Sequence, residues 1–147
     1  MRKLLVAAAA TALVAGAVVP GVDAASRTKL KATLTGAAEG AGGDADGTGT
    51  ARIRLFRKKV CFTIRMQNIG NSAAAHIHTG ARGVTGPVLV TLIDTVSDAT
   101  TRTGCSGKAK GATQRVIRSI RRHPRRFYVN VHNAEHPGGA IRGQLHR

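Results

Sequence analysis

Short runs in which apolar residues recur at every second position are the feature that most limits what this chain can fold into. The pattern occurs in residues 29–35, 51–55 and 60–66. A period of two places all the apolar side chains on one face of a β-strand. A basic turn at residues 57–59 separates the second run from the third, which predicts a β-hairpin. The chain is therefore expected to consist of short strands joined by turns.

Four further segments complete the predicted set of strands: residues 75–78, 88–93, 127–132 and 140–146. Residues 113–122 instead place Val and Ile at helical spacing, and the proline at position 124 ends that segment. Aromatic residues make up only 3% of the chain, so the core must be built from Val, Ile, Leu and Ala. About seven strands with turn signals between them predict an all-β fold, an antiparallel sandwich or barrel with one short helix.

The N-terminal residues have the composition of a secretory signal peptide. A basic start at residues 2–3 precedes an apolar, Ala-rich run over residues 4–19, and small residues at positions 22–24 offer a cleavage site. A retained membrane anchor is the alternative, but the run is short for a spanning helix. We therefore expect residues 1–24 to be a signal peptide. The protein would then be secreted or held in the cell envelope, with no transmembrane segment after cleavage.

Two segments without alternation are predicted to be loops. Residues 36–49 are rich in Gly, Ala and Asp and predict a flexible loop, and residues 94–110 are polar and predict a long one. The chain has two cysteines, Cys61 and Cys105, and the second lies in this long loop. An even pair of cysteines in a small exported domain favours one disulfide, which would tie the loop to the sheet; two free thiols are the alternative.

Histidines form the one group of residues that suggests chemistry. His76 and His78 stand two apart in a predicted strand, so their rings leave the sheet on the same side. His132 lies in another predicted strand on the face opposite its apolar residues, and His136, in the turn that follows, is a fourth candidate ligand that can approach the other three. Three nitrogen ligands with an open position suit copper(II) or a catalytic zinc ion. Histidines that are merely exposed remain the alternative.

Four sequence blocks, in this order, resemble the CHRD (chordin) domain. They are AHIHTG at residues 75–80, GVTGPVLV at 83–90, YVNVH at 128–132 and PGGAIRGQL at 137–145. The resemblance covers residues 29–147, nearly the whole predicted mature chain. It implies a secreted or cell-surface β domain with no settled activity.

The CHRD domain is in turn similar to the immunoglobulin-like barrel of copper/zinc superoxide dismutase. This similarity implies a Greek-key sandwich or barrel in which His76, His78 and His132 correspond to copper ligands. The bridging histidine and the zinc loop of the dismutases have no counterpart in this chain. These departures argue against dismutase activity and leave a mononuclear copper site open.

The chain is strongly basic, with 23 Lys and Arg against 7 Asp and Glu and a formal net charge of +16. The densest basic run contains Arg115, Arg118, Arg121, Arg122, Arg125 and Arg126. Two interpretations are open. The run is a patch that binds a polyanion such as an anionic envelope polymer, or it is a solvated face that keeps the protein soluble. Nucleic acid is not expected as the partner, because no reading motif is present and aromatic residues for base stacking are nearly absent.

These observations lead to three functional hypotheses. The first is an extracellular binding module of unknown ligand that holds copper through its histidines. The second is a copper-dependent redox enzyme resembling superoxide dismutase. The third is an envelope protein that binds polyanions or mediates adhesion through its arginine-rich segment.

Overall fold

A computed structural model describes residues 27–147, and the predicted signal peptide, residues 1–24, lies outside the described residues. Eight strands are present: β1 (Thr28–Thr35), β2 (Thr48–Leu55), β3 (Val60–Gln67), β4 (Ser72–Thr79), β5 (Val88–Ile93), β6 (Thr101–Ser106), β7 (Phe127–Asn133) and β8 (Ile141–Gln144). The one α-helix, α1, spans Gln114–Arg122. Three short 3-10 helices are η2 (Gly36–Glu39), η3 (Lys108–Lys110) and η4 (Pro124–Arg126). No helix in this described part is long and apolar enough to cross a membrane.

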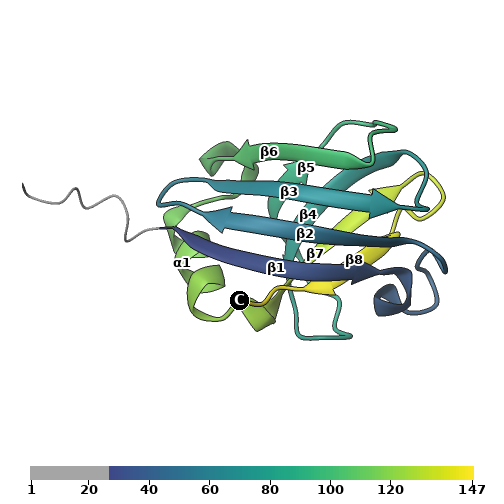
Figure 1. Ribbon diagram of the computed structural model, residues 1–147. Helices are drawn as coiled ribbons and strands as arrows, with labels where there is room; N and C mark the ends of the chain where they lie inside the picture. Colours follow the sequence, from purple (N-terminus) through teal and green to yellow (C-terminus); the bar gives the residue numbers. More distant parts are fainter. Residues whose placement is uncertain (1–26) are drawn as a thin grey trace, which may run out of the picture.

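The strands form a single antiparallel sheet that curls into two layers. Their order is β5-β4-β7-β8-β1-β2-β3-β6, so that β8 returns to lie beside β1. In Figure 1 the strands β1, β2, β3 and β6 lie in front of β4, β5, β7 and β8, and α1 covers one end. The two end strands approach each other where Ser106 Oγ donates a hydrogen bond to the Thr91 carbonyl. The sheet is therefore a nearly closed barrel, which confirms the predicted all-β fold with one short helix.

The apolar residues at alternating positions of the sequence form the core of the barrel. Leu30, Ile53 and Ile64 are fully buried, whereas their neighbours in the chain point outward. The register pairs Leu30 with Ile53 and Ile53 with Phe62, so apolar side chains from neighbouring strands meet on the inner face. Burial of such side chains stabilises a fold by about 1.5–3 kcal/mol each. The other face of each strand lies on the outside of the barrel, where its polar side chains are available for binding.

Helix α1 begins and ends where its sequence directs. The side chain of Thr113 accepts a hydrogen bond from the backbone N–H of Val116 and so caps the N-terminus. Ile117 and Ile120 are buried against the end of the barrel. At the other end, Pro124 cannot continue the helix and opens η4. The arginines of the helix are left on its outer side.

The prediction of one long loop over residues 94–110 is wrong, because residues 101–106 form β6. This strand pairs with β3 along its whole length. Its inner face carries no large apolar residue, so no alternation marks it in the sequence. Gly104 lies against the ring of Phe62, where a Cβ atom would come within 2.9 Å of Cζ. Backbone pairing with β3 therefore holds β6 in place, and the ring of Phe62 fills the space that a side chain at position 104 would otherwise occupy.

The prediction of a flexible loop over residues 36–49 also needs correction. Its first residues form η2, its last residues belong to β2, and the part between is held by backbone hydrogen bonds. The N–H of Asp44, for example, donates to the carbonyl of Ala140 at 2.9 Å. The segment is short of bulky side chains because it packs closely against β8 and the turn that precedes it.

The disulfide predicted between Cys61 and Cys105 is present. It joins directly opposite residues of β3 and β6 on the face away from the core, as expected for Cys61. Because 44 residues separate the two cysteines, the bond greatly restricts the unfolded chain. In the chain-entropy model a loop of this length corresponds to about 4 kcal/mol of stabilisation.

Replacing both cysteines by alanine should lower the free energy of unfolding by about 2–5 kcal/mol. Urea denaturation of the double variant and of the native protein under oxidising conditions measures this difference. The native protein in excess reductant should match the variant. Equal stability of the oxidised native protein and the variant would contradict the prediction.

Candidate metal centre

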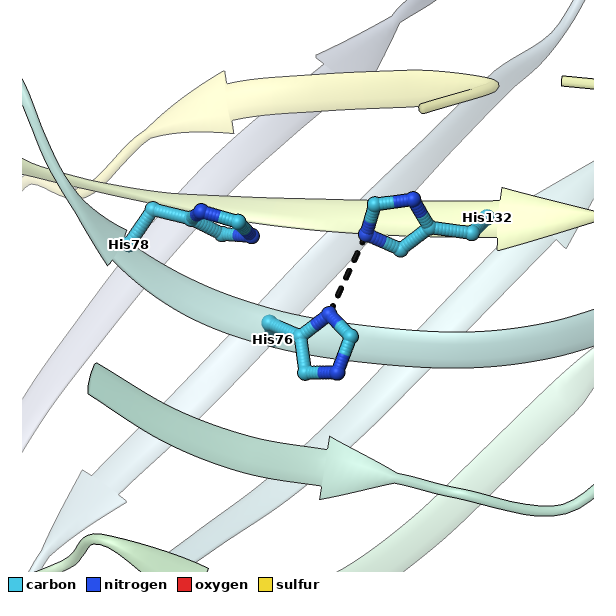
Figure 2. Close-up of side chains that lie close together, drawn as sticks. All are labelled: His76, His78 and His132. Atoms are coloured by element: carbon cyan, nitrogen blue, oxygen red, sulfur yellow. Dashed lines mark hydrogen bonds between the residues drawn. The ribbon is translucent and has the colours of Figure 1, made fainter. Parts of the chain in front are cut away.

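The pairing of β4 with β7 brings three of the predicted histidines together. In this antiparallel ladder Ala74 is opposite His132 and His76 is opposite Asn130. His76 and His132 are therefore diagonal neighbours on the outer face of the barrel, and His78 lies two residues farther along the same face. Figure 2 shows the three side chains on these two adjacent strands. The convergence expected from the sequence is found in the structure.

The three rings are close enough to share a ligand. Nδ1 of His76 lies 3.1 Å from Nε2 of His132, the contact drawn as a dashed line in Figure 2. One nitrogen from each of His76, His78 and His132 lies within 4.8 Å of the others. Within residues 27–147 this is the only cluster of three or more His, Cys, Asp or Glu side chains with that property. The group is named here the histidine cluster.

Backbone carbonyls fix the orientation of two of these rings. Nδ1 of His78 donates to the carbonyl of Gly86 at 2.9 Å, and Nδ1 of His132 donates to the carbonyl of Pro137 at 3.0 Å. A carbonyl only accepts, so the proton of each neutral ring is on Nδ1 and the lone pair is on Nε2. Such a hydrogen bond on the far nitrogen is the usual support of a metal-binding histidine. Nε2 of His78 is thus available as a ligand, whereas Nε2 of His132 accepts a hydrogen bond from Nδ1 of His76, which would be replaced when a metal ion binds.

His78 has a buried ring nitrogen that no group in the described part of the chain binds. The residue is only 8% exposed, and its Nε2 has no hydrogen-bond partner among the described residues. Its ring is stacked on that of Tyr128, with 4.9 Å between centroids and 11° between planes. A buried polar atom without a partner costs about 1–3 kcal/mol, so it is uncommon in a finished structure. A metal ion would satisfy this nitrogen.

The surroundings keep the cluster uncharged near neutral pH. Burial, together with the nearby rings of His132 and His78, lowers the pKa of His76 to about 4. Burial also lowers the pKa of His78, with a further contribution from Arg142 and an opposing one from the hydrogen bond to Gly86. Burial likewise lowers the pKa of His132, against the hydrogen bond to Pro137. Neutral imidazole is the form that binds a metal ion.

The structure does not bring His136 into the histidine cluster, and the expectation that it joins the other three is corrected here. Its Nδ1 donates to the carbonyl of Gly42 at 2.9 Å, and its Nε2 lies 3.9 Å from a carboxylate oxygen of Asp44. The backbone N–H of His136 is also bound by the side chain of Asn133. His136 therefore ties the turn after β7 to the segment after β1.

The six arginines of the predicted polyanion site lie in α1 and η4. Arg115, Arg118, Arg122, Arg125 and Arg126 are exposed, and Arg121 is half-buried. Three of them, Arg122, Arg125 and Arg126, border the same hollow of the surface. None of the six belongs to the histidine cluster.

Sequence reasoning missed the residues that support the cluster. The sequence assigns Tyr128 no role beyond its place in a strand, but its ring is stacked on that of His78, and its hydroxyl accepts a hydrogen bond from the N–H of Gly86. The guanidinium of Arg142 lies 5.0 Å from the centroid of the same ring. The Gly and Pro signals at positions 86 and 137 marked turns, but which carbonyl meets which ring depends on how those turns pack.

Comparison with known protein families gives one match, to the CHRD domain over residues 30–145. The chain belongs to the CHRD family. The match covers all eight strands except the first residues of β1, and it includes the whole histidine cluster. No curated protein and no solved structure gives a significant match, so the similarity of this CHRD domain to the dismutase barrel stays a prediction.

Acid should destabilise the metal-free CHRD domain through the histidine cluster. The pKa of His76 is lowered to about 4 in the folded protein, against 6.5 for the free side chain. Between these values the unfolded chain binds the proton and the folded one does not, so stability falls as the pH drops from 6.5 to about 4. Urea denaturation across this range measures the fall. His76→Gln should show a smaller fall, and an identical pH profile in both proteins would refute the assignment.

Proposed function

We propose that this protein is a secreted CHRD binding module that holds one copper(II) ion through His76, His78 and His132. The observation that carries the proposal is the unpartnered, buried Nε2 of His78, which lies within 4.8 Å of nitrogens of the two other histidines. An arrangement of histidines that were merely exposed would leave no such buried atom. The cluster thus supports a ligand site rather than a solvated group.

The donor set fits copper(II) best. Three imidazole nitrogens without a thiolate or carboxylate suit copper and zinc, and copper stands above zinc in the order of divalent affinities. The ligand atoms would be Nε2 of His78, Nε2 of His132 and, because it faces the latter, Nδ1 of His76. Bound copper would supply a Lewis-acid centre that also changes oxidation state. The chain itself orients the rings through Gly86 and Pro137 and stacks Tyr128 under His78.

Two further observations support a location outside the cytoplasm. Residues 1–24 have the pattern of a signal peptide. The disulfide between Cys61 and Cys105 belongs to the kind of bond that persists in oxidising compartments. A protein in such a compartment meets copper and zinc without the competition of cytosolic thiols. Secretion and metal binding are therefore compatible parts of one proposal.

The copper proposal is tested by titrating Cu(II) into the purified protein by calorimetry at pH 7.5. His78→Ala should weaken binding by at least about tenfold, since even a supporting residue is worth 10- to 100-fold. The triple variant His76→Ala/His78→Ala/His132→Ala should lose the specific site. His136→Ala is the matched control, because it removes an imidazole outside the cluster, and it should bind copper like the native protein.

Equal copper affinity of the native protein and the triple variant would overturn the proposal. Tighter binding of zinc than of copper would keep the site and change its metal. A superoxide assay on the copper-loaded protein separates a binding module from a redox enzyme. Turnover no faster than that of free copper is expected, and clearly faster turnover would make the protein a catalyst.

A further inference from the structure

Three neighbouring hollows form a continuous groove on the side of the barrel near α1 and β8. The first has a volume of about 490 Å³ and is bordered by Arg122, Arg125, Arg126 and Arg147. The second, of about 380 Å³, shares Arg125 and His146 with the first. The third, of about 450 Å³, shares Arg82, Gln144 and His146 with the second. The shared lining residues show that the three hollows adjoin one another, and together they are called the basic groove.

The basic groove carries a high density of positive charge. Six arginines line it: Arg82, Arg122, Arg125, Arg126, Arg142 and Arg147. None of the described Asp or Glu residues borders any of the three hollows. These arginines come from the loop after β4, from the segment that ends α1, from β8 and from the C-terminal residue. The fold therefore collects charges that are scattered along the sequence.

Arg142 gives the groove a buried end. The residue is only 6% exposed, yet it borders the third hollow. Its guanidinium lies over the ring of Tyr128, and its Nε donates to the carbonyl of Ala38. The nearest acid, Glu39, has a carboxylate oxygen 3.7 Å from the same Nε. Arg142 is therefore a fixed cation at this end, held by Ala38 and Tyr128 and partly balanced by Glu39.

The shape and lining of the groove define the class of partner. A guanidinium binds phosphate, sulfate or carboxylate with two parallel hydrogen bonds. A concave path with several such groups in a row fits a narrow chain better than the flat surface of a membrane. No Phe or Tyr borders the three hollows, so the large aromatic rings on which single-stranded nucleic acids usually stack are absent there, and only the smaller rings of His123 and His146 are present.

We propose that the basic groove binds a linear polymer of oxyanions, such as a phosphate- or sulfate-bearing chain. This site differs from the one expected from the sequence. Arg115 and Arg118 of α1 are exposed but border none of the three hollows, whereas Arg82, Arg142 and Arg147 join the groove from elsewhere. The groove contains no member of the histidine cluster, so it would act beside the proposed metal site and not through it.

The test uses end-labelled inorganic polyphosphate and the purified protein, with binding followed by fluorescence anisotropy at several salt concentrations. A long chain should bind at least about a hundredfold more tightly than orthophosphate, because one polymer engages adjacent sites together. The groove variant Arg82→Gln/Arg147→Gln should weaken binding and reduce the slope of log affinity against log salt by about one for each charge removed. Both residues are exposed, and within the described residues the side-chain contact that is lost is the surface hydrogen bond from Arg147 to the Arg121 carbonyl, so circular dichroism and urea denaturation should confirm an unchanged fold.

The matched control is Arg115→Gln/Arg118→Gln, which removes the same net charge from positions outside the groove. It should leave the affinity within about twofold of the native value, as expected for charges that make no contact. Equal weakening by both double variants would show a diffuse charge effect and overturn the proposal. Heparin in place of polyphosphate separates a sulfated from a phosphate polymer. Tighter binding of single-stranded DNA or of anionic lipid vesicles would overturn the assigned class of partner.

Discussion

The antiparallel pairing of β4 with β7 is the interaction on which the candidate metal centre depends. It sets Ala74 opposite His132, so that the ring of His132 lies diagonally beside that of His76. A register shifted by one residue would turn every side chain of one strand to the other face, and the histidines of β4 would point into the core. The buried apolar residues of both strands, such as Ile77 and Val131, hold the register in place. The core therefore fixes the geometry of a site that lies outside it.

Two turns next to β4 and β7 orient the histidine rings that these strands bring together. The loop after β4 brings the carbonyl of Gly86 to His78, and the turn after β7 brings that of Pro137 to His132. Only glycine fits at position 86, where a Cβ atom would come within 1.9 Å of the Thr79 carbonyl. This close return of the chain also covers His78 and lets Tyr128 stack beneath it. Burial then lowers the pKa values of the three histidines, which keeps their lone pairs available near neutral pH.

The same fold separates two kinds of chemistry. Neutral imidazoles gather over β4 and β7, whereas arginines gather along the basic groove near α1 and β8. Tyr128 and Arg142 lie between them, since the ring of Tyr128 is stacked on His78 and faces the guanidinium of Arg142. Arg142 is close enough to lower the pKa of His78, so its positive charge also acts on a cation held by the histidine cluster, whereas the exposed arginines of the basic groove are screened by solvent. The fold remains stable with a net charge of +16 because most of the charged side chains are exposed on the polar faces of the strands and of α1. Solvent and salt screen the repulsion between exposed charges.

The sequence alone predicted seven of the eight strands, the short helix, the disulfide pair and the three residues of the histidine cluster, because each is marked by a local pattern of period, spacing or residue type. It did not reveal β6, whose inner face lacks apolar residues and whose existence depends on pairing with β3. It also placed His136 with the other histidines, although the packing of the turn directs that ring to Gly42 and Asp44. Which arginines line one groove was decided only by the tertiary structure, since closing the barrel brings together residues that are up to 65 positions apart, from Arg82 to Arg147. Local periodicity sets which face a side chain occupies, but only the packed fold sets its neighbours.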